Sequence, residues 1–118
     1  MLGKSVAAFA FLTAGAALAQ APVATVQYSC AEAKSLSAEY FDGPTRTAPD
    51  GRPIPGGRVI LTLADGKKLT LPQTLSGSGI RYANEGESFV FWSKGDTAFV
   101  EEGRNQTVTY KDCVGRKN

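Results

Sequence analysis

The sequence predicts an all-β domain in which short antiparallel strands close into a small barrel. Apolar and polar residues alternate along most of the chain after residue 20, which is the period of half-buried strands. Turn-forming residues separate these runs at short intervals, and no long window carries a helical apolar stripe. About eight short strands in one small chain predict an antiparallel sandwich or a closed barrel, and closure is favoured because it removes unpaired strand edges.

The first nineteen residues have the pattern of a signal peptide. Lys4 gives a positive start, Val6 to Leu18 form an apolar run rich in alanine, and Ala17-Leu18-Ala19 supplies the small residues that a signal peptidase recognises. The 118 residues suffice for one domain but not comfortably for two. We therefore expect a signal peptide over residues 1–19, a single β-barrel domain over residues 20–118, and release into the periplasm without a membrane anchor.

Two alternating runs open the mature chain. The first places Val26, Tyr28 and Cys30 on one face, and a second run over residues 36–40 repeats the pattern after a turn. The stretch from Gly43 to Gly57 contains four prolines and four glycines with few large apolar residues, so we expect an exposed connecting loop there.

The next two runs predict a hairpin around Asp65-Gly66. Placing Leu63 opposite Leu69 and Leu61 opposite Leu71 keeps these side chains on one face. That register requires an odd-numbered loop or a bulge rather than a two-residue turn. Four further strands are expected, at Ile80 to Tyr82, Phe89 to Ser93, Thr97 to Glu101 and Val108 to Cys113.

Composition argues against several functional classes. Thirteen basic and eleven acidic residues leave a formal charge of +2, so we expect no nucleic-acid-binding patch. The chain has no histidine, which is the commonest general base and metal ligand, and two cysteines alone cannot complete a tetrahedral zinc site. The acidic pairs Glu101-Glu102 and Glu85…Glu87 flank turns and are expected to be solvated. We therefore expect no enzyme activity, no metal and no cofactor.

The two cysteines, Cys30 and Cys113, lie near opposite ends of the mature chain. In an exported protein they can oxidise, and with only two present a single pairing is possible. The alternative, a redox-active pair, lacks the Cys-x-x-Cys spacing. We therefore expect one structural disulfide.

Two polar stretches stand out as a candidate site. Ser76-Gly77-Ser78-Gly79 predicts a loop with accessible N–H groups and little side-chain cover. The β-prone run from Phe89 to Trp92 leads into Ser93-Lys94-Gly95-Asp96, where the chain can turn back into the next strand. The two stretches predict a polar loop and a lysine-tipped hairpin side by side on a rigid scaffold.

Four features of the mature chain are similar to motifs of one known family. Tyr28-Ser29-Cys30 looks like an opening Tyr-x-Cys, and Cys113 like the closing cysteine. Ser76 to Tyr82 is a complete match to Ser-Gly-Ser-Gly-x-x-Tyr. Ser93-Lys94-Gly95 is similar to the end of Tyr-x-x-x-Thr-Lys-Gly, with serine for threonine and Phe89 where the tyrosine would be. From Tyr28 to Cys113, except for the long proline-glycine loop, the chain thus resembles the MliC/PliC family of bacterial inhibitors of c-type lysozyme, in its periplasmic branch.

The resemblance implies an eight-stranded antiparallel β-barrel with one disulfide, and c-type lysozyme as the protein partner. The two motifs would meet and enter the lysozyme active-site cleft, with Ser76, Ser78 and Lys94 facing the catalytic carboxylates and Tyr82 supporting the loop. The motif leaves open which serine makes the closest contact, and Ser78 is favoured. Phe89 would remove one possible hydrogen bond. Carried over by matching positions, the lysozyme-binding residues are Ser76, Gly77, Ser78, Gly79, Tyr82, Ser93 and Lys94. The resemblance leaves the affinity, the preferred lysozyme and the oligomeric state open.

An alternative of a different class is a periplasmic β-barrel that binds a small apolar ligand or lipid. Trp92, Phe89, Phe91 and Phe99 could line a cavity instead of filling a core, and small eight-stranded barrels can do either. A lysis assay with a c-type lysozyme separates the two hypotheses.

Overall fold

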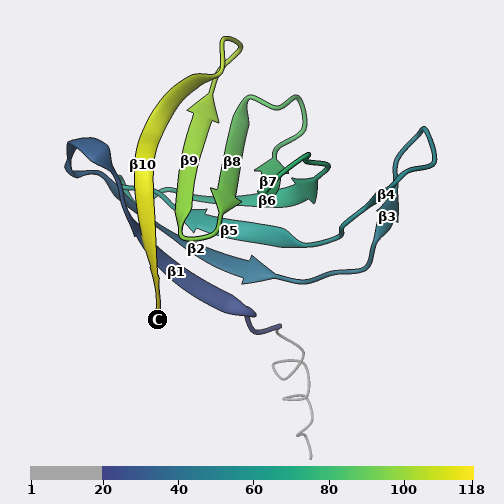
Figure 1. The fold of residues 1–118 in the computed structure, drawn as a ribbon, viewed down its shortest axis with the longest axis horizontal. Helices are drawn as coiled ribbons and strands as arrows, with labels where there is room; N and C mark the ends of the chain where they lie inside the picture. The colour runs from purple at the N-terminus through teal and green to yellow at the C-terminus, as the bar shows by residue number, and fades with distance from the viewer. Residues whose placement is uncertain (1–19) are drawn as a thin grey trace, which may run out of the picture.

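A computed structural model describes residues 20–118, and the expected signal peptide lies outside these described residues. The domain is a closed barrel of eight antiparallel strands, as expected (Figure 1). Its strands are β1 (Ala24–Ser29), β2 (Ser35–Phe41), β5 (Arg58–Thr62), β6 (Lys68–Thr74), β7 (Ile80–Ala83), β8 (Phe89–Lys94), β9 (Thr97–Glu102) and β10 (Thr107–Lys117). Around the barrel their order is β1-β10-β9-β8-β7-β6-β5-β2, and β1 closes the sheet by pairing with β2.

Period-two alternation gives the barrel its core. Each of the eight strands contributes buried inward-facing side chains, and Phe91 is fully enclosed at 0% exposure. Its ring lies against three tyrosines, with centroids 5.9 Å from Tyr28, 6.4 Å from Tyr40 and 6.1 Å from Tyr82. Aromatic rings at these separations add to the hydrophobic stabilisation of the core.

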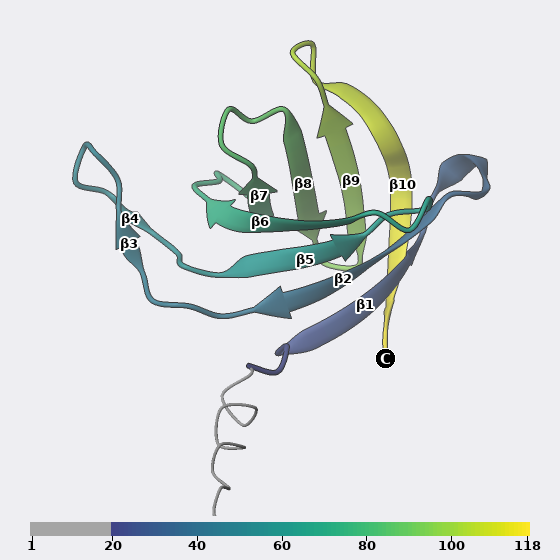
Figure 2. The ribbon, with the colours of Figure 1, turned by 180° about the vertical axis from the view of Figure 1, so that it is seen from behind.

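The connection expected at Gly43 to Gly57 carries secondary structure of its own. Two short strands, β3 (Arg46–Thr47) and β4 (Pro53–Ile54), pair as a separate two-stranded sheet. This hairpin projects beyond the ends of β2 and β5 in both ribbon views (Figures 1 and 2). Arg46 ties it to the barrel by donating a hydrogen bond to the carbonyl of Gln73 at 2.6 Å.

The predicted register of the β5–β6 hairpin is wrong by two residues. Leu61 lies opposite Leu69 rather than opposite Leu71. The turn is shorter than that prediction requires, because Gly66 adopts a φ of +90° and the Leu63 N–H bonds to the Lys67 carbonyl at 2.8 Å. A glycine with positive φ is what a three-residue hairpin loop uses. The loop is odd-numbered, as expected, so the leucines still share one face.

The predicted disulfide between Cys30 and Cys113 is present. It crosses the seam where β1 pairs with β10, the two strands that join the start of the barrel to its end. A short 3₁₀ turn, η2 (Ala31–Ala33), follows Cys30 and leads into β2. Within residues 20–118, no helix has the length and apolar character needed to cross a membrane.

Candidate functional site

The serine-glycine loop and the lysine-tipped hairpin lie side by side at one end of the barrel, as expected. The loop connects β6 to β7, and the turn at Gly95-Asp96 connects β8 to β9. Because β7 pairs with β8 and Ile80 lies opposite Ser93, the two connections are neighbours. Lys94 Nζ donates a hydrogen bond to Ser78 Oγ at 3.4 Å. This pair, Lys94 and Ser78, is the exposed chemical centre of the site.

The two serines of the loop have different tasks. Ser76 Oγ donates to the Ser78 carbonyl at 2.6 Å and accepts from the Ser78 N–H at 3.2 Å. Such a local side-chain–backbone bond pair holds a loop in one conformation. The hydroxyl of Ser76 is therefore occupied within the loop, whereas the hydroxyl of Ser78 is presented outward beside the Lys94 ammonium.

Gly79 lets the loop approach the hairpin closely. It adopts a φ of +70°, and a Cβ at this position would lie 2.8 Å from the Ser93 carbonyl oxygen and 3.2 Å from Lys94 Cβ. Gly77, two residues earlier, would place its Cβ in open space. The close approach that positions Ser78 beside Lys94 therefore depends on the second glycine of the motif.

Gly79→Ala should lower the free energy of unfolding by about 1–3 kcal/mol and should also weaken any binding by the loop. The left-handed backbone is costly for a residue with a Cβ, and the backbone carbonyl of Ser93 has to move. Gly77→Ala is the matched control and should change the free energy of unfolding by less than about 1 kcal/mol. Urea unfolding of both variants tests this, and equal effects at the two glycines would contradict the structural role assigned to Gly79.

Lys94 is exposed, and no carboxylate in the described part of the chain, residues 20–118, neutralises it. Among residues 20–118 the ion pairs are Arg52 with Asp50 and Arg81 with Glu87. The Lys94 side chain extends away from the barrel interior, and within residues 20–118 its ammonium is held only by the Ser78 hydroxyl. A cation in this position is available to an anionic group of a partner.

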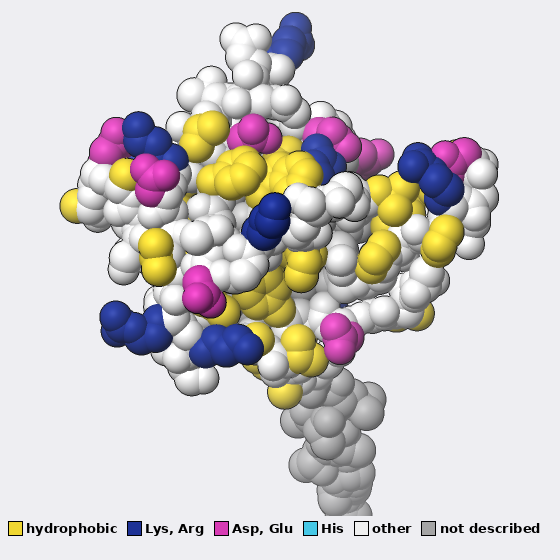
Figure 3. All heavy atoms as spheres, in the orientation of Figure 1, with side chains coloured by type: hydrophobic (Ala, Val, Ile, Leu, Met, Phe, Trp, Pro, Cys, Tyr) yellow, Lys and Arg dark blue, Asp and Glu magenta, His cyan; other side chains and the backbone are white. Residues whose placement is uncertain are grey.

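The outer wall next to the site carries aromatic side chains. Trp92 and Phe99 lie opposite each other on β8 and β9, with ring centroids 6.1 Å apart and planes inclined by 17°. Figure 3 shows hydrophobic side chains gathered over these two strands. Phe89 and Phe91 face the core instead. The four aromatic residues therefore do not line one shared cavity, and the arrangement predicted for an apolar-ligand barrel is wrong.

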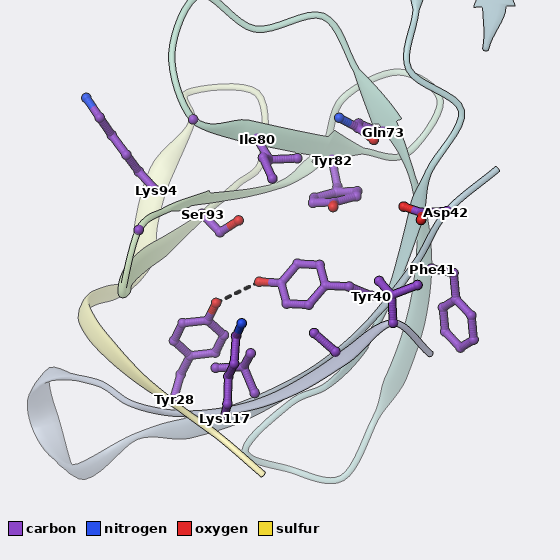
Figure 4. Close-up of a pocket in the computed structure, with 15 residues that line it drawn as sticks. Tyr28, Tyr40, Phe41, Asp42, Gln73, Ile80, Tyr82, Ser93, Lys94 and Lys117 are labelled. Carbon is purple, nitrogen blue, oxygen red and sulfur yellow. Dashed lines mark hydrogen bonds between the residues drawn. The ribbon is translucent and has the colours of Figure 1, made fainter. Parts of the chain in front are cut away.

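Two predicted site residues lie beneath the surface. Ser93 and Tyr82 are only 7% and 4% exposed, and both face the barrel interior (Figure 4). Beside them the Tyr28 and Tyr40 hydroxyls share a hydrogen bond of 2.6 Å. The predicted set is thus divided: five residues are exposed at the barrel end, at positions 76–79 and 94, and two are buried inside the barrel.

A hollow of about 460 Å³ opens at this end of the barrel, and sequence reasoning did not identify it as part of the site. Its walls include Tyr28, Tyr40, Tyr82 and Ser93, and Gly79 lies at its rim. The alternation of residues along β8 contained the signal for Ser93. Phe89 and Phe91 face inward, so position 93 must face inward as well.

The interior tyrosines resist ionisation. Burial raises the pKa of Tyr28 above its ordinary value of 10.0, and the hydrogen bond with Tyr40 adds to the increase. Burial likewise raises the pKa of Tyr82, with smaller contributions from nearby Tyr40 and Asp42. Burial also raises the pKa of Tyr40. The folded protein therefore keeps these hydroxyls protonated at a pH where the unfolded chain loses their protons.

The free energy of unfolding should fall as the pH rises above about 10. A folded pKa above the unfolded value means that the stabilisation is complete below pH 10 and is lost at higher pH. Each such tyrosine contributes a slope of about 1.4 kcal/mol per pH unit. Urea unfolding from about pH 8 to 11 should show this decline, and Tyr82→Phe should reduce its slope by one tyrosine's share. An unchanged slope in Tyr82→Phe would show that Tyr82 ionises normally in the fold.

Comparisons with known proteins agree with the fold and the motifs. A family model described as "Membrane-bound lysozyme-inhibitor of c-type lysozyme" matches residues 54–109. A protein of that name from Yersinia enterocolitica is 50% identical over 56 residues, covering 48% of this chain and 44% of that protein. Another from Cupriavidus necator is 34% identical over 80 residues, covering 68% of this chain and 54% of that protein. The chain thus spans about half the length of the curated relatives it matches.

A solved structure shares the fold. It is the crystal structure of PliC-St, the periplasmic lysozyme inhibitor of C-type lysozyme from Salmonella typhimurium. The TM-score is 0.51 at 18% sequence identity, over 76% of this chain and 93% of that one. At this identity the likeness concerns the fold alone.

Fold and site together define a small closed β-barrel that presents a serine-glycine loop and a lysine on neighbouring connections. With the sequence matches, this places the chain in the MliC/PliC family. The relatives reported above are named as inhibitors rather than as enzymes.

Proposed function

We propose that the protein inhibits c-type lysozyme by placing Lys94 and Ser78 in the enzyme's active-site cleft. The observation that carries this proposal is the exposed pair itself: the Lys94 ammonium, which forms no ion pair with a carboxylate of the described residues 20–118, lies 3.4 Å from an outward-facing serine hydroxyl. The names of the relatives point to the same target. Inhibition requires no chemistry by the inhibitor, since a filled cleft cannot admit the cell-wall polysaccharide.

The chemistry of the pair suits a glycosidase cleft. Such a cleft holds two carboxyl groups in a groove shaped for sugar rings. An ammonium between them gains charge-assisted hydrogen bonds, which are stronger than neutral ones, and a small hydroxyl can stand where a sugar hydroxyl binds. Lys94 would supply the charge and Ser78 the hydroxyl.

The other predicted residues would act by holding this pair in place. Ser76 fixes the loop by bonding to the Ser78 backbone, and Gly79 allows the close approach to the hairpin. Tyr82 and Ser93 are buried below and would support the two connections without touching the enzyme. This rigid support reduces the conformational entropy lost on binding.

Phe89 should not weaken this contact. It lies at the start of β8, at the opposite end of the strand from Lys94, and is 8% exposed in the core. A phenol at this position would therefore lie far from the exposed pair. We expect the departure from the family's tyrosine to affect the core rather than the lysozyme-binding surface.

We also propose that the protein acts in the periplasm without a lipid anchor. A disulfide forms and persists in an oxidising compartment. Both of the chain's cysteines belong to the disulfide, so neither is free to carry a lipid. Fractionation of cells that produce the protein should find it in the periplasmic fraction, and recovery with the membranes would contradict this location.

A lysis assay tests the proposed function. The purified domain should slow the clearing of a bacterial cell-wall suspension by a c-type lysozyme in a dose-dependent manner. A lysozyme of another structural type serves as the control for nonspecific protection of the cell walls. Undiminished lysis by c-type lysozymes at high inhibitor concentration would reject the proposal.

A further inference from the structure

We propose that the outer wall of the barrel beside Lys94 forms a second contact with the same partner. We call this surface the aromatic ladder, and it consists of Arg81, Trp92 and Phe99. The inference rests on the proposed function and extends it from the two tip residues to a defined face of the sheet. The occupant that it predicts is the protein rim of the c-type lysozyme cleft.

The ladder follows from strand register. Arg81 on β7 lies opposite Trp92 on β8, which lies opposite Phe99 on β9. These positions alternate with the inward-facing ones, so all three side chains point away from the core. The Arg81 guanidinium carbon lies 5.7 Å from the centre of the Trp92 ring, and Phe99 stacks on that ring from the other side.

The ladder is held rigid before any partner arrives. Arg81 forms an ion pair with Glu87 at 3.0 Å and donates a hydrogen bond to Thr74 Oγ1 at 2.9 Å. Trp92 is fixed between Arg81 and Phe99. An aromatic side chain ordered in advance loses little entropy when it is covered, and tryptophan and arginine are enriched among residues that dominate binding energy.

The ladder is continuous with the exposed pair. A hollow of about 320 Å³ on this wall is lined by Ser78, Lys94, Trp92 and Phe99, together with Thr97 and Ala98. A partner group that meets Lys94 and Ser78 from this side would therefore also cover the Trp92 ring. Because Trp92 and Phe99 line the part of the hollow next to Lys94, that part suits an apolar or aromatic side chain of the partner rather than a second anion.

The size of a stable interface also requires such an extension. Specific protein complexes typically bury about 800 Å² on each partner, contributed by roughly 20–30 residues. The exposed motif residues number only five, at positions 76–79 and 94. The interface must spread to one side of them, either over the ladder or over the barrel mouth near Val23. The ladder offers ordered aromatic area, whereas Val23 is a small side chain that is 61% exposed.

The chain's single tryptophan makes the test direct. The domain is produced with 5-fluorotryptophan and titrated with unlabelled c-type lysozyme, so that the only ¹⁹F resonance reports on position 92. The resonance should shift or broaden as the complex forms. This readout requires no substitution and is unaffected if a variant fails to fold. A resonance that is unchanged at saturation, while calorimetry shows binding, would overturn the inference.

Substitutions give a second, independent readout. Trp92→Ala and Phe99→Leu should each weaken lysozyme binding at least about tenfold. Val108 is exposed at the opposite end of the barrel. Val108→Ala should therefore change the affinity for lysozyme less than twofold. If Val23→Ala weakens binding and the ladder variants do not, the interface runs over the barrel mouth and the inference is wrong.

The same experiments separate this inference from the function on which it rests. Absence of binding by the wild-type domain to c-type lysozyme would reject both. Binding that is lost in Lys94→Ala but retained in Trp92→Ala and Phe99→Leu would reject only the ladder and leave the proposed function intact.

Discussion

Replacing Lys94 by alanine should weaken binding to c-type lysozyme by roughly 2–5 kcal/mol, which is a factor of about 30 to several thousand in Kd. The substitution would leave the catalytic carboxylates of the enzyme covered by protein but without their cation. Most of the loss should appear as faster dissociation, because a desolvated charge pair chiefly determines how long a complex lasts. Calorimetry measures the loss of affinity, and surface-based kinetics measure the dissociation rate.

Two comparison variants make the Lys94 result specific. Lys67 lies in the β5–β6 turn, at the opposite end of the barrel from the loop, so Lys67→Ala removes one positive charge without touching the proposed site. The affinity of the Lys67→Ala variant for c-type lysozyme should change little. Ser78→Ala should cost about 0.5–1.5 kcal/mol, because a neutral hydroxyl contributes only a modest net hydrogen bond. All three variants should melt near the wild-type temperature, since these side chains are exposed.

Acidic pH should weaken the same contact. As the pH falls toward the ordinary carboxyl range, the lysozyme carboxylates take up protons and the attraction of the Lys94 ammonium is lost. The pH dependence of Kd should therefore be smaller in Lys94→Ala than in the wild type. Equal affinities for Lys94→Ala, Lys67→Ala and the wild type would contradict the assignment of Lys94 to the cleft.

Removing the disulfide should lower the free energy of unfolding by roughly 2–5 kcal/mol, the usual loss in a small secreted domain. Cys30 and Cys113 are 83 residues apart and join the two strands that close the barrel. Without the bond, the unfolded chain gains the freedom of a large loop. The double variant Cys30→Ala with Cys113→Ala avoids a free thiol and isolates this effect.

Urea unfolding measures the loss of unfolding free energy that follows removal of the disulfide. Reduced and oxidised wild-type protein form the matched pair. The reduced wild type should resemble the double variant in its unfolding midpoint. A double variant as stable as the oxidised wild type would show that the β1–β10 pairing closes the barrel without help from the disulfide.

Alternation and turn residues were sufficient to predict the eight barrel strands, and the closed barrel followed from the advantage of having no unpaired strand edges. A period of two identifies each strand and its inward face independently of its neighbours. Register was not predictable in the same way, because it depends on turn length, and the positive φ of Gly66 shortens the β5–β6 loop. The small β3–β4 hairpin was missed because its strands are two residues long and too short to show a period.

The motif residues of the site were predictable from the sequence, but which of them are exposed and which are buried was not. The motifs identified the loop and Lys94, and the pairing of β7 with β8 brings them together. Their residues do not all share one surface, since Ser93 and Tyr82 face inward. The aromatic ladder depends on contacts among three strands, and only their register places Arg81, Trp92 and Phe99 in one row.

The central claim is that this barrel occupies the substrate cleft of c-type lysozyme. The most direct test is calorimetric titration of the enzyme with the wild-type domain, alone and in the presence of an oligosaccharide of N-acetylglucosamine that fills the cleft. We expect measurable binding that weakens in proportion to the occupancy of the cleft by the sugar. Binding of undiminished affinity to the sugar-saturated enzyme would contradict it, because the two ligands would then occupy separate surfaces.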